Sequence, residues 1–170
     1  MAPVLQLRKL IAARPDPLSI GEIAVRTFET DGDIAAFLDL RHRAFARQRI
    51  GVRQWTRDDF LQEFVSHWWW QPTRMWFAEQ ESEIATGTPK QLVGSATLAM
   101  RGEPNSARPV VHWLMVLPTA RRQGIGRLLM AHVERAAWDA GHREVYLETH
   151  AQWLAAVQFY ESLGYTTDTR

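Results

Sequence analysis

Cysteine is absent from the 170 residues, and lysine occurs only as Lys9 and Lys90. The lack of cysteine excludes a disulfide framework, a thiolate zinc site and a cysteine nucleophile. No apolar run approaches the roughly 20 residues of a membrane span, and the first residues lack the apolar core of a secretory signal. We therefore expect a cytoplasmic protein with no membrane partner.

An excess of positive charge is also missing. Twenty Lys and Arg residues face 19 Asp and Glu residues, which gives a formal net charge of +1. Proteins that bind a nucleic-acid backbone usually carry a clear basic excess, so no nucleic-acid partner is expected. No two histidines and a carboxylate occur at metal-ligand spacing either, and we predict no metal site.

The chain has the length of one compact domain and contains no repeat. Residues 1–21 are predicted to form an N-terminal arm or short helix, because their apolar residues recur at helical spacing before Pro15. Residues 22–170 are predicted to form one domain with the element order β-α-α-β-β-β-α-β-α-β. This order is typical of the α/β class with a mixed sheet. The apolar residues of the N-terminal stripe are Val4, Leu7, Leu10 and Ile11.

A helix in the first half of this domain is predicted to start at a capping box. Thr56 and Asp59 have the spacing at which each side chain caps the other's backbone amide. Trp68 continues the apolar stripe of this helix and is expected in the core. Trp69 and Trp70 are expected to line a pocket or a dimer surface instead.

The strongest local signal is a glycine-rich helix start after an apolar strand. The strand is PVVHWLMVLP, residues 109–118, and the helix start is ARRQGIGRLLM, residues 120–130. A dinucleotide fingerprint would need glycine at Leu129, and a P-loop would need lysine and then serine or threonine at Arg127 and Leu128. Glycines, unpaired amides and nearby arginines at a helix start suit a pyrophosphate group.

This stretch resembles the acetyl-CoA loop of the GNAT acetyltransferase superfamily, whose pattern is [RQ]-x-x-G-x-[GA] after a strand that ends V-x-P. A second resemblance follows about thirty residues later, where AAVQFYESLGY matches the pattern A-x-x-x-Y-E-x-L-G-[FY]. The resemblance covers roughly residues 22–170. It implies a GNAT-like, mostly antiparallel central sheet flanked by helices, with acetyl-CoA as cofactor.

The resemblance also implies which residues hold acetyl-CoA. The loop would bind the pyrophosphate through its amides and arginines, and the preceding strand would pair with the pantetheine arm through its backbone. The residues implied are Leu114, Met115, Val116, Arg121, Arg122, Gln123, Gly124, Ile125, Gly126 and Arg127.

Two catalytic residues are expected. Tyr160 lies at the family position that often carries the general acid, and a phenol can protonate a departing thiolate. The family's glutamate base is absent from the strand 110–116, but this strand holds His112, a natural base near neutral pH. Strand alternation is expected to place His112 on the face of Leu114 and Val116. Deprotonation through water remains the alternative.

The predicted reaction is direct attack of a primary amine on acetyl-CoA in a ternary complex, with a small-molecule or peptide amine as acceptor. The alternative is a catalytically inactive acyl-CoA-binding module. Glu148 and His150 are weaker candidates for amine binding, and Trp153 replaces a family asparagine that contacts CoA. Only five residues follow Tyr165, where the family usually continues into another strand. We therefore expect a truncated hairpin or a homodimer that supplies the missing edge.

Overall fold

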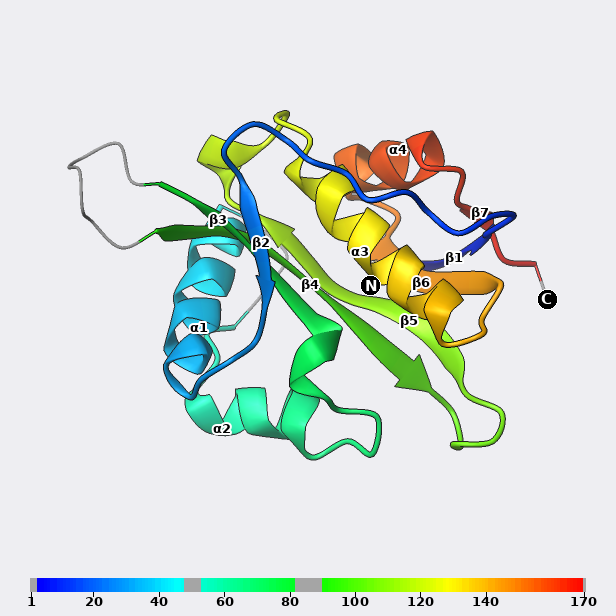
Figure 1. Cartoon of the computed structure of the whole chain (residues 1–170), viewed down its shortest axis with the longest axis horizontal. Helices are drawn as coiled ribbons and strands as arrows, with labels where there is room; N and C mark the ends of the chain where they lie inside the picture. The colour runs from blue at the N-terminus through cyan, green and yellow to red at the C-terminus, as the bar shows by residue number, and fades with distance from the viewer. Residues whose placement is uncertain (1–2, 48–52, 82–89, 170) are drawn as a thin grey trace.

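A mixed sheet runs through the molecule in the strand order β2-β3-β4-β5-β6-β1-β7 (Figure 1). The computed structural model describes residues 3–47, 53–81 and 90–169, and the sheet is given over these residues. Neighbouring strands are antiparallel except β5 and β6, which are parallel. The strands are β1 (Val4–Leu10), β2 (Ala24–Thr27), β3 (Met75–Gln80), β4 (Gln91–Arg101), β5 (Arg108–Val116), β6 (Glu144–His150) and β7 (Thr166–Thr167).

Helices cover both faces of this sheet. In Figure 1, α3 crosses in front of β4 and β5, α1 lies behind the sheet, and α2 lies beside the end of α1. Gly94 on β4 allows the close approach of α3, since a Cβ there would lie 3.0 Å from Leu129 Cδ1 and 3.1 Å from Ile125 Cγ2. The helices are α1 (Gly32–Phe45), α2 (Arg57–Phe60), which continues as a π-helical turn (Leu61–Val65), α3 (Ile125–Asp139) and α4 (Leu154–Ser162).

The N-terminal segment forms a strand, so the prediction of a short helix there is wrong. All seven residues of β1 pair with β6, from Val4 opposite His150 to Leu10 opposite Glu144. The apolar spacing fits a helix, but an isolated helix of this length is marginal in water, and the edge of β6 offers a full ladder of hydrogen bonds. After β1 the chain crosses in front of α3 and enters β2 (Figure 1).

Strand β1 also occupies the sheet position beside β6, where the sequence predicted a missing edge. β1 lies between β6 and β7, and Leu7 and Arg8 pair with Thr167 and Thr166. The edge that was expected to be truncated, or to come from a second chain, is therefore supplied by residues near the N-terminus of this chain. A homodimer stays a prediction. From β2 onward the elements follow the predicted order, and the hairpin loop expected between β3 and β4 lies in residues 82–89, outside the described residues.

The helix that begins with α2 agrees with its prediction at its start and departs from it toward its end. The capping box at Thr56 and Asp59 is confirmed, since both reciprocal bonds are present. The π-helical turn that follows inserts extra backbone per turn and changes the phase of the apolar stripe. The helix ends at Val65, so its apolar stripe does not extend to Trp68 or Trp69. Trp68 is 53% exposed and Trp69 is 5% exposed, which reverses the expected placement of these two side chains.

Candidate active site

A large cavity opens where β5 and β6 separate. The two strands share a single paired position, Val110 with Tyr146, and diverge beyond it. The cavity measures about 1110 Å³ and is bounded by β5, the glycine loop, β6 and α4. Of the residues predicted to form the site, the cavity is lined by His112, Leu114, Val116, Arg121, Arg122, Gly124, Ile125, Gly126, Arg127 and Tyr160.

The glycine loop turns sharply into α3 at one end of this cavity. Gly124 caps the helix with φ +84°, in the left-handed region that favours glycine, and Arg122 has φ +64°. The first bond of the helix runs from the Leu128 amide to the Gly124 carbonyl, at 2.9 Å. The amides before Leu128 therefore have no carbonyl of their own helix to bind, and the positive end of the helix dipole lies at the cavity.

The loop arginines fall into two groups. Arg121 donates from Nε to the Val116 carbonyl and from a terminal nitrogen to the Ala44 carbonyl, each at 3.2 Å, and so ties the loop to the end of α1. Arg122 and Arg127 line the cavity and form no ion pair with a described residue. The side chains of Arg122 and Arg127 are therefore available to bind an anion in the cavity. A contact between Arg121 and the cofactor stays a prediction.

Two predicted cofactor residues do not line the cavity with their side chains. Met115 is 2% exposed and belongs to the core, and Gln123 is exposed on the loop. A contact through the Met115 or Gln123 backbone stays a prediction.

An irregularity in β5 changes which residues share a face. Thr97 pairs with His112 and Ser95 pairs with Met115, so two residues, Trp113 and Leu114, oppose one residue of β4. The bulge breaks the alternation of side chains, and the prediction that His112 shares a face with Leu114 and Val116 is wrong. All three still line the cavity, because β6 has already separated from β5 beside them.

His112 has a carboxylate partner that the sequence did not reveal. Glu63, in the π-helical turn, accepts at Oε1 from the His112 Nε2 at 2.8 Å and from the Trp113 indole Nε1 at 3.1 Å. The hydrogen bond from His112 lowers the pKa of Glu63 below its ordinary value, and the one from Trp113 adds a smaller effect in the same direction. Partial burial acts in the opposite direction but does not outweigh them. No local motif marks Glu63, since it lies 49 residues from His112.

The neighbourhood of His112 is aromatic. Its ring lies 5.6 Å from the Phe64 ring, 6.0 Å from Trp113 and 6.5 Å from Trp69, measured between centroids. Arg41, 4% exposed, stacks on Trp113, with 4.7 Å between its guanidinium carbon and the ring centroid. Burial, followed by repulsion from Arg53, lowers the pKa of Arg41 to about 10.

Tyr160 lies on α4 at the wall of the same cavity. It is 9% exposed, and its ring packs against Phe159 and Tyr165 at centroid distances of 5.4 and 6.0 Å. Burial raises the pKa of the Tyr160 hydroxyl. The phenol therefore keeps its proton at neutral pH, which a general acid requires.

Charged and aromatic groups from β6, α1 and the start of α4 also line this cavity. Glu148 accepts from Arg101 and from Gln6 of β1, and the Arg101 bond keeps the pKa of Glu148 low although burial opposes it. Trp153 packs on His150 at 4.7 Å and on Phe45 at 6.1 Å between centroids. Its buried indole Nε1 has no hydrogen-bond partner among the described residues, so this tryptophan offers a donor where the family has asparagine.

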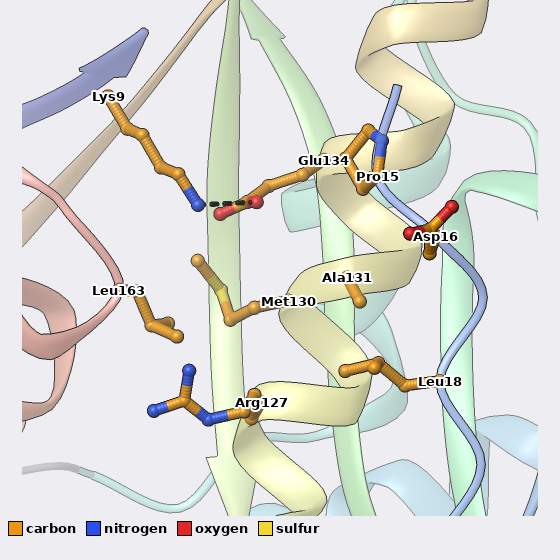
Figure 2. A pocket seen from close by; sticks show the side chains of 9 residues that line it. All are labelled: Lys9, Pro15, Asp16, Leu18, Arg127, Met130, Ala131, Glu134 and Leu163. Atoms are coloured by element: carbon orange, nitrogen blue, oxygen red, sulfur yellow. Dashed lines mark hydrogen bonds and ion pairs between the residues drawn. The ribbon is translucent and has the colours of Figure 1, made fainter. Parts of the chain in front are cut away.

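A smaller cavity of about 270 Å³ lies beside α3, under the crossing N-terminal segment (Figure 2). Lys9 and Glu134 form an ion pair of 2.8 Å on its wall, and the Tyr165 hydroxyl donates to the same carboxylate at 3.1 Å. Arg127 lines both cavities. The polar groups Lys9 and Glu134 on this wall are thus engaged with each other.

Neither a metal cluster nor a membrane span occurs in residues 3–47, 53–81 and 90–169. These residues contain no group of three histidine or acidic side chains that could hold a metal ion. None of their helices has the length and apolar character needed to cross a membrane.

A mixed sheet whose central parallel pair diverges in front of a glycine-led helix is the arrangement of the GNAT fold. The family model "Acetyltransferase (GNAT) family" matches residues 34–165, and the chain belongs to this family. The mycothiol acetyltransferase of Frankia casuarinae is 31% identical over 174 residues, which cover 98% of this chain and 49% of the relative. The chain spans about half the length of the curated relatives it matches.

Solved structures share the fold at lower identity. A GCN5-related N-acetyltransferase from Sphaerobacter thermophilus has a TM-score of 0.73 and 19% identity, over 97% of this chain and 48% of that chain. The NatC complex bound to Gag peptide and CoA contains a chain with a TM-score of 0.65 and 21% identity, over 84% of each chain.

Proposed function

We propose that this chain is an acetyl-CoA-dependent N-acetyltransferase acting on a primary amine. One observation carries the proposal: the glycine-led start of α3, Tyr160 and His112 line one cavity between the diverging strands. The first would bind an anion, and the other two would move protons. Membership of the GNAT family, and the mycothiol acetyltransferases among the relatives, support the same reaction class.

The loop has the features that a pyrophosphate needs. Gly124 adopts a left-handed conformation, and a Cβ on Gly126 would lie 3.0 Å from Phe159 Cζ, so side chains at both positions are disfavoured. The backbone can therefore approach a ligand closely at this point. Arg122 and Arg127 would add charge-assisted hydrogen bonds. Leu114 and Val116 would lie along the pantetheine arm.

The chemistry requires two proton transfers. Acetyl-CoA supplies a thioester, whose C–S bond breaks as the amine nitrogen forms the new C–N bond. His112 would take the proton that the amine loses, directly or through one water. Tyr160 would give its hydroxyl proton to the departing thiolate and later regain one from solvent.

The acceptor would enter beside His112, on the side of the cavity away from the loop. Glu148 and the rings of Phe45, Trp113 and Trp153 line the same cavity. A carboxylate next to aromatic faces suits a cationic amine. The acceptor used by the mycothiol acetyltransferases, amino sugars, aromatic amines and peptide N-termini would therefore form the first substrate panel.

Thiol release from acetyl-CoA across this panel tests the proposal. The wild type should turn over at least one amine. Tyr160→Phe should reduce kcat by roughly 100-fold or more while acetyl-CoA still binds. Binding of CoA without turnover of any amine would favour the inactive acyl-CoA-binding module instead.

A further inference from the structure

The contact between Glu63 and two consecutive residues of β5 is the most unusual feature of the site. Side chains that follow one another in a regular strand point to opposite faces of the sheet. Here His112 and Trp113 both donate to the same oxygen, Oε1 of Glu63. The bulge makes this possible, since Trp113 has φ +50°, a rare conformation for a bulky residue.

The carboxylate reaches this position through a second irregularity. Glu63 lies in the middle of the π-helical turn Leu61–Val65, closed by the bond from the Ser66 amide to the Leu61 carbonyl at 2.9 Å. Single π turns and strand bulges both occur preferentially at functional sites. Two rare backbone features, 49 residues apart in sequence, thus converge on one imidazole.

We propose that Glu63 is a positioning residue for His112, and this inference rests on the proposed acetyltransferase function. Glu63 is absent from the cavity lining, so it acts through the imidazole rather than on a substrate. Its Oε1 accepts a proton-bearing Nε2, which leaves Nδ1 as the nitrogen with the free lone pair. The Trp113 indole holds the carboxylate in place with a second hydrogen bond.

The surroundings favour a strong contact. The rings of Phe64, Trp69 and Trp113 pack around the imidazole, and the side chains of His112 and Glu63 are 27% and 36% exposed, so the hydrogen bond is partly shielded from water. The other charged groups near the pair are His67 and Arg41 beside Glu63, and Glu148 across the cavity from His112. None of these three makes a hydrogen bond to His112 among the described residues.

Substitution of Glu63 tests the proposal. Glu63→Gln should lower kcat about tenfold to a hundredfold and leave the KM for acetyl-CoA unchanged within about twofold. In a His112→Ala background the same substitution should change kcat less than about twofold, because its effect passes through the imidazole. Asp58→Asn makes the same chemical change at an exposed position of α2 and is the matched control.

A spectroscopic measurement separates this inference from the activity. The ¹⁵N chemical shifts of the His112 ring should report the Nε2–H tautomer in the wild type and in Asp58→Asn, and a mixture of tautomers in Glu63→Gln. The positioning role would be overturned if the effects of Glu63→Gln and His112→Ala on kcat multiplied fully in the double variant. It would also be overturned if the ring shifts of His112 did not respond to Glu63→Gln. If the wild type turns over no amine, the proposed function fails, and the ring shifts alone decide whether Glu63 sets the tautomer.

Discussion

Replacement of Gly124 by alanine tests the glycine loop as the binding site for CoA. Gly124 caps α3 with φ +84°, and an alanine in this left-handed conformation costs about 1–2 kcal/mol. For a chain of this length, that cost corresponds to a decrease in Tm of about 2–8 °C. A Cβ there would also lie 2.8 Å from Ile20 Cδ1, the movable end of a side chain.

The expected loss of CoA affinity is larger than the loss of stability explains. If the loop relaxes toward φ below zero, the amides at the start of α3 turn away from the cavity. A hydrogen bond to a charged group contributes about 1.5–3 kcal/mol, so the Kd for CoA should rise roughly tenfold to a hundredfold. Isothermal titration calorimetry with CoA, together with thermal unfolding, measures both quantities.

Gly141→Ala is the matched control for this experiment. Gly141 has φ +92°, a Cβ added there would have no atom within 4 Å, and the residue does not line the cavity. It should lose similar stability and bind CoA like the wild type. Adding Ile20→Val to Gly124→Ala removes the contact with Cδ1 but not the backbone strain, so the weak binding should persist. Equal CoA affinity in Gly124→Ala and Gly141→Ala would refute the assignment of the loop.

Three further predictions concern stability. Asp33 is 6% exposed; although burial disfavours its ionisation, Arg26 and the amides of Glu29 and Thr30 hold its pKa below the ordinary value. The ion pair should therefore stabilise the fold above about pH 4 and lose this effect as the pH falls further. Asp33→Asn should lower the unfolding free energy by about 3 kcal/mol at pH 7, and urea titrations should find this difference shrinking below pH 4; a constant difference would contradict the assignment. Gly94→Ala should cost about 1–3 kcal/mol in the same assay, because the new Cβ meets α3 and the Met115 carbonyl at 3.0–3.1 Å; unchanged stability would mean that α3 moves freely on β4. Burial raises the pKa of Tyr160, so the folded protein should lose stability above about pH 10, where the unfolded chain ionises; Tyr160→Phe should reduce this alkaline loss, and an identical slope in both proteins would argue against a buried phenol.

Several features of the site were predictable because they depend on short stretches of sequence. The apolar strand 109–118, the glycine-led helix start and the segment around Tyr160 each carry a local pattern, and the cavity contains residues from all three. The capping box at Thr56 and Asp59 is local in the same way.

The remaining features depend on contacts between distant segments. The helical spacing near the N-terminus could not reveal β1, because the strand is stabilised by pairing with β6, more than 130 residues away. The alternation along β5 could not place His112, because a bulge interrupts it. The helical stripe likewise could not place Trp68 and Trp69, because the helix ends at Val65 and packing beyond it decides their exposures.

The sequence by itself therefore determined the family, the glycine-led helix start with its arginines, and the two side chains proposed to move protons. Each of these depends on residue type at fixed local spacing, which the order of residues contains in full. Only the tertiary structure decided that Glu63 meets His112 and Trp113, and that β1 completes the sheet. Both depend on backbone irregularities or strand pairing that gain their stability from packing across the whole fold, and local propensity does not encode them.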